Sequence, residues 1–209
     1  MNTGCIQENI HAFTNFPSIS YTLEKGERLV LYAVISKGWS ERKTLSILLN
    51  DEYASCDVAL FFLGENTENF PCDVIIKSHA RATYTSVVVR SLLTDASSLD
   101  MNGICELLPG SQKSEMFFAS HSLLLSDSSQ AKVIPSLEVQ VDDIKASHAA
   151  TLGKLDDEKM FFLRVRGFTQ KQATQLIAQN FFASHMAKIP EQYKETITKP
   201  LDAFLKKIR

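Results

Sequence analysis

Short apolar runs separated by polar breaks fill the chain between Glu27 and Thr151. Val, Ile, Leu and Phe dominate the runs, and Gly, Pro, Asn, Asp and Ser fill the breaks, which is typical of strands and turns. Successive runs begin about ten to fifteen residues apart, and no helical pattern of useful length lies between them. This regular spacing predicts either a solenoid of stacked coils or a sandwich of two sheets.

Two internal repeats favour the solenoid. The triplet Cys-Asp-Val begins at Cys56 and again at Cys72, and the similar stretches LLTDASS and LLLSDSS occur at 92–98 and 123–129. Stacked coils place equivalent residues in equivalent environments, whereas a hairpin sandwich favours two-residue Asn-Gly or Asp-Gly turns. Asn102-Gly103 has this composition but lies inside an apolar run. We therefore expect a parallel solenoid, in which Cys56 and Cys72 lie close together if they stack on adjacent coils.

After Gly153 the pattern changes to helical spacing. Asp156 can cap a helix over 157–166 that ends at Gly167, and Thr169 with Gln172 forms a capping box for the next helix. The apolar stripe expected on that second helix consists of Ala173, Leu176, Ile177, Phe181 and Ser184. Pro190 and Pro200 are each acceptable in a first helical turn, and the last amphipathic stretch contains Ile197, Leu201, Phe204, Leu205 and Ile208. The split predicts a β body and a helical tail that form separate packing units.

Charge and composition exclude several classes of protein. The net charge of −2 argues against general nucleic-acid binding, although residues 155–209 carry 10 basic and 6 acidic side chains. No apolar run is long enough to span a bilayer, and the N-terminus does not resemble a secretory signal, so we expect a cytoplasmic protein. The four cysteines are scattered and form no CxxC pair, which in a reducing compartment predicts free thiols: Cys5, Cys56, Cys72 and Cys105.

The segment that begins at Leu123 and ends at Ile177 resembles the C-terminal part of the SufB/SufD family of iron–sulfur cluster assembly proteins. The matching elements are Leu123–Ser126, Pro135 with Leu137-Glu138-Val139, Asp142-Asp143, Ser147-His148, Ala150-Thr151, Leu155-Asp156, Phe162-Leu163-Arg164 and Arg166-Gly167. Strands from about Cys72 onward also resemble this family, whereas the match further upstream is loose. Many positions agree in order over about fifty residues, and no single motif carries the resemblance.

The resemblance implies a right-handed parallel β-helix followed by a small helical domain, with no turnover of its own. It implies a N-terminal segment over 1–26, a β-helix core over 27–152 and a helical domain over 153–209. Family members are longer, so we expect part of the usual N-terminal region to be absent and residues 1–26, or a second copy, to cap the exposed coil. The implied partners are a SufC-type ABC ATPase, held by the C-terminal helices, and a SufB-type paralogue or a second copy.

The chain also departs from the family pattern. Ser129 stands where SufB-type chains place a functional cysteine, Ala149 replaces a glutamate, and Ala146 replaces a cysteine that is frequent in SufD-type chains. His148 is the one implied ligand that remains, and imidazole does ligate iron and some clusters. The sequence therefore predicts a SufD-like chain that binds no cluster alone and shares a transient iron–sulfur cluster with a partner. The alternative for His148 is a locally hydrogen-bonded polar residue at the end of the β body.

Aromatic and arginine residues in the helical region are candidate partner contacts, because such residues are favoured interface anchors. They are Phe161, Phe162, Arg164, Arg166, Phe181 and Phe182. Two adjacent phenylalanines on one helix cannot share a face, so we expect Phe161 and Phe162 to divide between the β body and another surface. Phe181 and Phe182 should likewise divide between core and contact, in helices beyond Thr169 that present the ATPase-binding surface. The alternative is a helix buried on two sides with its arginines in salt bridges.

Two other functions stay open at this point. A β-solenoid interaction protein that has lost the iron–sulfur role would account for the missing cysteines. A β-helix hydrolase that uses paired carboxylates, such as Asp142-Asp143, is the third hypothesis.

Overall fold

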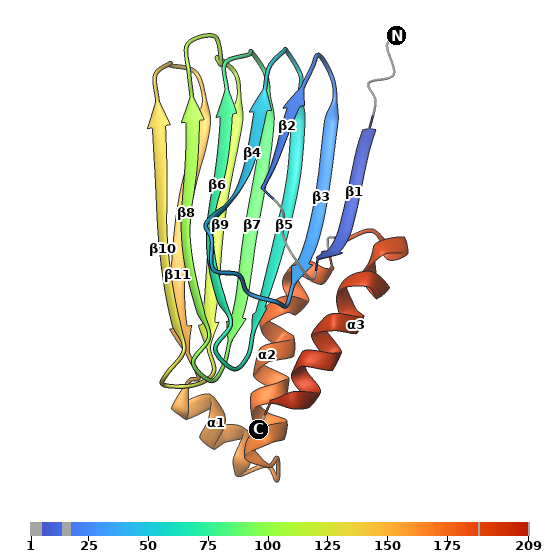
Figure 1. Ribbon diagram of the computed structural model, residues 1–209, viewed down its shortest axis with the longest axis vertical. Coiled ribbons are helices and arrows are strands. Elements are labelled where there is room, and N and C mark those ends of the chain that lie inside the picture. The colour runs from blue at the N-terminus through green and yellow to red at the C-terminus, as the bar shows by residue number, and fades with distance from the viewer. Residues whose placement is uncertain (1–5, 14–17, 188, 209) are drawn as a thin grey trace.

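The computed structural model of the protein describes residues 6–13, 18–187 and 189–208. In these residues a series of strands precedes three helices (Figure 1). The strands are β1 (Ile6–Phe13), β2 (Ile19–Leu23), β3 (Arg28–Ile35), β4 (Lys43–Leu49), β5 (Ser55–Gly64), β6 (Asn69–Ser78), β7 (Tyr84–Leu93), β8 (Ser98–Leu107), β9 (Glu115–Leu124), β10 (Gln130–Val139) and β11 (Lys145–Lys154). The helices are α1 (Asp157–Arg164), α2 (Gln170–Met186) and α3 (Glu191–Lys207).

Alternate strands belong to two parallel sheets that face each other. The sheet that we call sheet A has the order β1-β3-β5-β7-β9-β11, and sheet B has the order β10-β8-β6-β4-β2. Every strand pairing between described residues is parallel, as in Ser55↔Tyr84 and Tyr84↔Glu115. Each coil therefore contributes one strand to each sheet, which confirms the parallel β-solenoid and excludes the hairpin sandwich.

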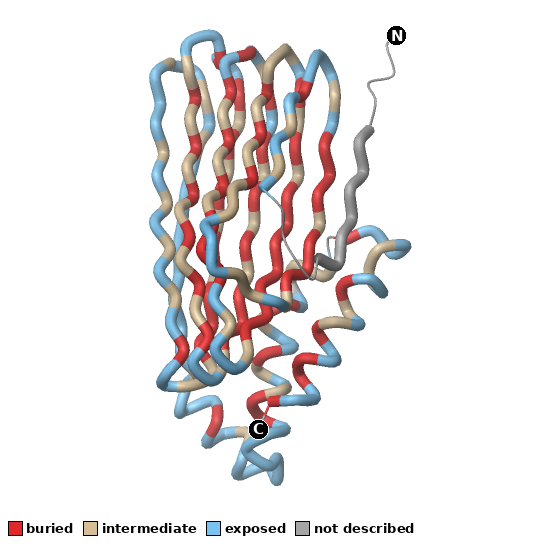
Figure 2. Tube along the Cα trace, viewed as in Figure 1, coloured by how far each residue is buried: buried red, intermediate tan, exposed pale blue. Residues whose placement is uncertain are grey.

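The space between the sheets, which we call the lumen, is filled by every second side chain of each strand. In β8 buried and half-buried residues alternate along the whole strand, and Leu99, Met101, Cys105 and Leu107 face inward. This is the period of two that a strand with one apolar face requires. Gly103 continues that inward row, and the Phe118 ring lies where a Cβ at this position would be. The Asn102-Gly103 pair is thus a packing feature inside a strand and does not form a turn. Figure 2 shows buried positions recurring along the strands of the solenoid.

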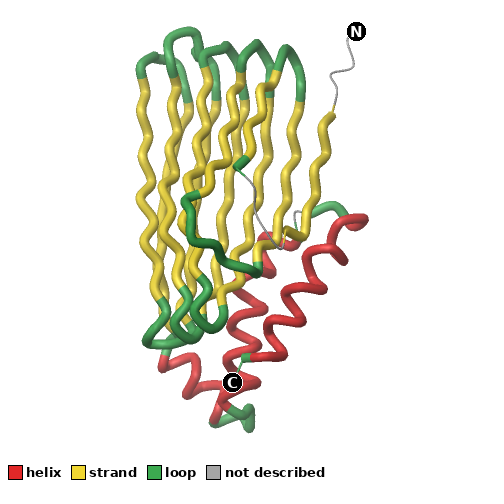
Figure 3. The backbone as a smooth tube through the Cα atoms, in the orientation of Figure 1, coloured by secondary structure: helices red, strands yellow, loops and turns green. Residues whose placement is uncertain are grey.

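The stacked coils explain one internal repeat but not the other. Leu92 pairs with Leu123 in the same sheet, so the Leu-Leu repeats lead into equivalent turns. Figure 3 shows the loops that join the strands at the ends of the solenoid. The Cys-Asp-Val repeats lie on β5 and β6, which belong to opposite sheets. Cys56 pairs with Leu29 and Thr85, whereas Cys72 pairs with other residues in sheet B. The condition for the two cysteines to lie close together is not met, because equivalent positions recur every second strand.

The N-terminal segment contains strands of the same solenoid. β1 pairs with β3 over its full length, and β2 pairs with β4 from Ile19 to Leu23. Residues 6–13 and 19–23, which we expected to cap the first coil, therefore add a further coil. The rest of the predicted cap at 1–5 and 14–17 lies outside the described residues.

The caps of the first two helices follow the sequence signals. The Asp156 carboxylate accepts hydrogen bonds from the backbone N–H groups of Glu158 and Lys159 at the start of α1. Gly167 has a positive φ of 92°, as expected of a residue that ends a helix. Thr169 and Gln172 form the predicted capping box of α2.

Helices α2 and α3 pack on the outer face of sheet A. One apolar cluster joins strand and helix side chains: Val34, Ala59, Phe61, Leu63, Leu92, Leu123, Ala178, Phe182, Ile189, Ile197, Leu201, Phe204, Leu205 and Ile208. The expectation of separate packing units is therefore wrong for α2 and α3. This contact also explains why β5 is buried on both faces along most of its length.

Two details of these helices differ from the prediction. The buried face of α2 contains Ala173, Thr174, Ala178 and Phe182, whereas Leu176 is exposed and Phe181 half-buried. Pro200 lies inside α3, and does not begin a helix. None of the helices in the described part of the chain is sufficiently long and apolar to cross a membrane.

Candidate functional site

The last coil of the solenoid has exposed strand edges. β10 and β11 are the last strands of sheets B and A, and among the described residues each pairs with a neighbour on one side alone. Leu152 on β11 is 58% exposed and Ile134 on β10 is 45% exposed. An unpaired strand edge presents backbone N–H and C=O groups that another chain can pair with. We call this surface, formed by β10 and β11, the open end.

His148 lies on the open end. Its register partner is Phe118, which faces the lumen, so His148 points to the lumen side of β11. It is exposed because no coil formed by the described residues covers it. The described residues contain no group of three or more His, Cys, Asp or Glu side chains that could hold a metal ion. The structure therefore offers one accessible imidazole here.

The described cysteines are not accessible to join His148. Cys56, Cys72 and Cys105 are all buried, and burial raises the pKa of each thiol to about 12. The thiolate is the form that binds metals and attacks sulfur. These buried thiols are therefore not metal ligands or nucleophiles while the chain is folded. Cys5 lies outside the described residues.

The replaced family positions also have ordinary structural roles. Ser129 is buried and donates a hydrogen bond from its Oγ to the Ser126 carbonyl oxygen at 2.8 Å. Ala146 packs against the lumen core, and Ala149 lies on the opposite, exposed face of β11. None of these three side chains is a metal ligand.

Helix α1 exposes most of its apolar side chains. Phe161 is 69% exposed and Phe162 is 53% exposed, and Met160 is the buried residue of this helix. The expectation that one phenylalanine packs on the β body is wrong, since both face solvent. Val165, Phe168 and Leu176 are exposed beside them. We call the five residues Phe161, Phe162, Val165, Phe168 and Leu176 the α1 patch.

Grooves flank α1 on two sides. One, of about 650 Å³, lies between α1 and α2 and is lined in part by Phe162, Leu163 and Leu176. The other, of about 550 Å³, contains Met160, Phe161 and Val165. The Arg166 guanidinium lies 3.2 Å from the centroid of the Phe162 ring and donates to the Phe162 carbonyl oxygen. Arg164 and Arg166 are both exposed, so the helix is not buried on two sides.

Phe181 and Phe182 have a different environment. Phe182 is 1% exposed and contacts Phe61 of sheet A, with ring centroids 5.5 Å apart. Phe181 is half-buried under the Arg90 guanidinium, which lies 4.9 Å from its ring centroid, and Arg90 donates to the Phe181 carbonyl oxygen. Phe182 therefore anchors α2 to the sheet and is not available to a partner in this structure.

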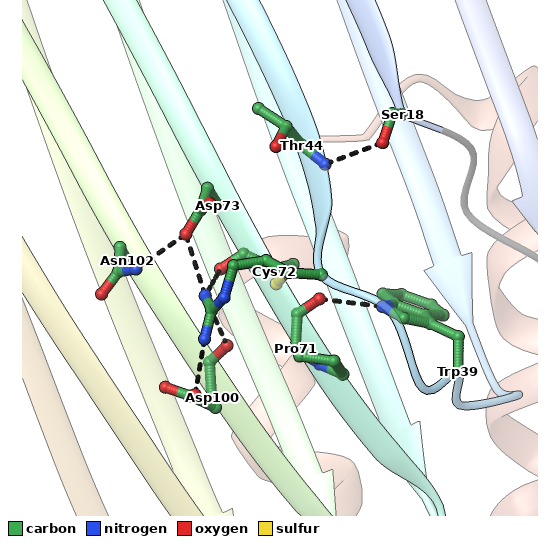
Figure 4. Close-up of polar contacts among 9 residues, drawn as sticks. Ser18, Trp39, Thr44, Pro71, Cys72, Asp73, Asp100 and Asn102 are labelled. Carbon is green, nitrogen blue, oxygen red and sulfur yellow. Dashed lines mark hydrogen bonds and ion pairs between the residues drawn. The ribbon is translucent and has the colours of Figure 1, made fainter.

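A polar cluster on sheet B was not predicted from the sequence. Arg42 reaches across the face of the sheet to Asp73 on β6 and Asp100 on β8, at 2.9 Å and 2.5 Å (Figure 4). Asn102 donates a further hydrogen bond to Asp73 at 2.7 Å. Sequence reasoning missed it because the residues are far apart along the chain and meet through the register of β6 and β8 and the loop before β4.

Comparisons with known proteins agree with the resemblance. The family model described as SUF system FeS cluster assembly, SufBD core domain, matches residues 1–181. The iron–sulfur cluster assembly protein SufD of Bacillus subtilis is 27% identical over 147 residues, which cover 70% of this chain and 33% of that protein.

Further relatives give the same picture. SufD of Escherichia coli is 33% identical over 94 residues, covering 45% of this chain and 22% of that protein. An iron–sulfur cluster assembly SufBD family protein of Pyrococcus horikoshii is 30% identical over 113 residues, covering 54% and 25%. The match thus spans a third or less of the length of these relatives.

Proposed function

Because the chain belongs to the SufBD family, whose core-domain model covers residues 1–181, we propose that it is a non-enzymatic, SufD-like scaffold or accessory subunit in iron–sulfur cluster assembly. In this proposal it acts in the cytoplasm and docks a SufC-type ABC ATPase through its C-terminal helices. The names of its relatives support the pathway. The observation that carries the docking is the α1 patch, which exposes the adjacent phenylalanines Phe161 and Phe162 and also Phe168.

The apolar area of the helices is divided between two surfaces. α2 and α3 direct Phe182, Leu201 and Phe204 onto sheet A, so these side chains stabilise the fold. The described residues leave the side chains of the α1 patch exposed, and a groove lies on each of two sides of α1. Aromatic side chains that enter pockets on a partner carry much of the free energy of binding in protein interfaces. We therefore assign the ATPase contact to α1 and the start of α2, not to Phe182.

The open end is the surface proposed for a SufB-type paralogue or a second copy. Two such ends related by a two-fold axis would pair β11 with its counterpart in the antiparallel direction, because a two-fold axis across the strand edge reverses its direction. The exposed Leu152 and Ile134 would be buried in that contact. An added strand satisfies the free backbone groups of the edge.

His148 fits a cluster that is shared and not one that this chain holds alone. The imidazole is accessible at the open end, and the three described thiols are buried with raised pKa values. The chain thus supplies one nitrogen ligand, and a partner would supply the remaining ligands. In this proposal the cluster is cargo that is bound transiently between the two chains.

The alternative is a β-solenoid interaction protein that has lost the iron–sulfur role. The observation that favours it is the replacement of the implied ligand positions by Ser129, Ala146 and Ala149, none of which binds iron. The two functions differ in the role of His148. The scaffold needs its imidazole as a cluster ligand, whereas the interaction protein does not need it.

Binding to a SufC-type ATPase tests the docking surface. The double variant Phe161→Ala/Phe162→Ala should weaken binding about thirtyfold, as expected when interface anchors are truncated. Tyr53→Ala is the matched control, because Tyr53 is 62% exposed but lies on a turn of the solenoid. Calorimetry on the purified chains gives both dissociation constants. Unchanged affinity of the double variant would refute docking through α1.

A further inference from the structure

Residues 36–42, between β3 and β4, form a strap over sheet B. β4 begins at Lys43, which pairs with Cys72, whereas β6 already begins at Asn69. The first three residues of β6 therefore have no partner on β4, and the strap occupies that place. The Trp39 backbone N–H donates to the Asn69 carbonyl oxygen at 2.8 Å, and the Trp39 indole Nε1 donates to the Pro71 carbonyl oxygen at 2.8 Å (Figure 4).

Trp39 covers the lumen at this corner. Its ring is half-buried and meets Phe70 edge-on at 5.6 Å, and Phe70 in turn packs on Phe62 deeper in the core. Gly38 lets the strap approach β6 closely, since a Cβ there would lie 2.5 Å from the Asn69 backbone N and O atoms. Where β4 does not reach the first residues of β6, the Trp39 ring of the strap therefore covers the lumen.

Arg42 fastens the end of the strap to two strands. Its guanidinium forms ion pairs with Asp73 and Asp100, and donates to the Cys72 carbonyl oxygen at 2.9 Å. The Arg42 side chain is 36% exposed, so solvent and salt screen these ion pairs. The part of the fastening that Arg42 supplies is therefore electrostatic and accessible to ions.

The strap has fewer attachments than the strands around it. β6 is paired along most of its length with β4 on one side and with β8 on the other. Among the described residues the strap forms no strand ladder. It is held by the contacts of Trp39 and Arg42 given above and by the Gly38 backbone N–H, which donates to the Glu68 carboxylate. Segments with few buried contacts and exposed hydrogen bonds open locally at a lower free energy than the ladders of a core.

We propose that residues 36–42 are a latched lid, whose opening admits small solutes to the lumen beside Cys72 while the rest of the solenoid stays folded. Cys72 is the natural reporter of this opening, because it is the first β6 residue with a β4 partner and its thiol is 1% exposed when the lid is closed. Cys56 and Cys105 are equally buried but lie under intact ladders. The lid gives the solenoid a side entrance that is separate from the open end.

Thiol alkylation with iodoacetamide, quantified for each cysteine by mass spectrometry, measures the opening. A Cys5→Ser background removes the thiol outside the described residues. Arg42→Ala should raise the rate of Cys72 labelling about three- to tenfold, as two exposed ion pairs are lost. Trp39→Ala should raise it about a hundredfold, because a half-buried aromatic contact and its hydrogen bond are lost. Raising the salt to 1 M should accelerate Cys72 labelling in the parent chain but not in Arg42→Ala.

Arg28→Ala is the matched control. Arg28 forms an ion pair of 2.9 Å with Asp57, but on sheet A and away from the strap. The control should leave Cys72 labelling unchanged, and in every variant Cys56 and Cys105 should stay protected. An unchanged rate at Cys72 in Arg42→Ala overturns the proposal. So does equal acceleration at all three cysteines, which would mean that the whole chain opens, or an equal effect of the control.

Discussion

The substitution Phe182→Ala tests whether α2 is part of the folded core. Phe182 is 1% exposed and lies between Phe61 of β5 and Phe181, with ring centroids 5.5 Å and 5.4 Å away. It is also the largest fully buried side chain that the helices contribute to the apolar cluster on sheet A. Truncation to alanine removes the ring and leaves a cavity that β5 and the helix cannot close without shifting.

The expected loss of stability is large. Truncating a buried phenylalanine to alanine lowers the free energy of unfolding by about 3–5 kcal/mol, because transfer free energy and a cavity both contribute. Small domains unfold with about 5–15 kcal/mol, so a substantial part of the total is lost. For a chain of this size such a change lowers the melting temperature by roughly 10 °C.

Urea unfolding followed by circular dichroism gives the free energy, and Phe162→Ala is the matched control. Phe162 is 53% exposed, so its removal should change the free energy of unfolding by less than about 0.5 kcal/mol. ATPase binding should show the opposite order, with the larger loss in Phe162→Ala. The reasoning fails if the two variants are equally stable, or if Phe182→Ala loses binding while its unfolding midpoint is unchanged.

Two further predictions concern titratable groups. His148→Ala should lower cluster-dependent activity in the cell and leave the urea midpoint unchanged, because an exposed imidazole leaves little cavity; an equal loss of folding and activity would support a structural role. The Cys56 thiol, with its pKa raised by burial from 9.0 to about 12, keeps its proton in the folded state while the unfolded thiol ionises. Its contribution to stability is therefore complete below pH 9 and is lost as the pH rises towards 12, at about 1.4 kcal/mol per pH unit. Urea titrations of the parent chain and Cys56→Ala between pH 7 and 10 should differ in slope, and parallel pH profiles would contradict this.

Local signals in the sequence identified the elements well. Asp156, Thr169 and Gly167 each act through hydrogen bonds or backbone angles within a few residues, so their roles follow from neighbouring positions. The strand region was predictable for the same reason, because an inward row of apolar residues needs only the period of two. Parallel pairing followed from the repeats and from the family resemblance.

The buried face of α2 could not be read from hydrophobicity. The stripe that contains Leu176 and Phe181 is the more hydrophobic face of α2. The helix nevertheless buries Ala173 and Ala178, and Ala178 packs in the apolar cluster on sheet A. Small residues allow a helix to lie close to a flat sheet, so their size decides the contact. Pro200 was misplaced for a related reason, since packing of Ile197 and Leu201 on both sides of it holds the helix continuous.

Side-chain contacts between different coils could not be predicted from the sequence either. The cluster of Arg42, Asp73 and Asp100 depends on a strap that replaces three residues of β4, and nothing in the local pattern marks where that strand begins. Exposure of both Phe161 and Phe162 was missed because periodicity alone cannot show which faces of α1 the described part of the fold leaves uncovered.

The seam between the strands and the helices connects the two proposed contact surfaces. Leu155 and Asp156 separate the last residue of β11 from the first residue of α1, and the Asp156 side chain fixes the start of the helix through two backbone N–H groups. α1 buries Met160 and little else, so this short joint is one of its main attachments. A partner bound to α1 would therefore lie next to the end of β11, the strand that carries His148. Under the proposed function, ATPase docking and contact at the open end involve adjoining elements, and a variant at either surface has to be measured at both.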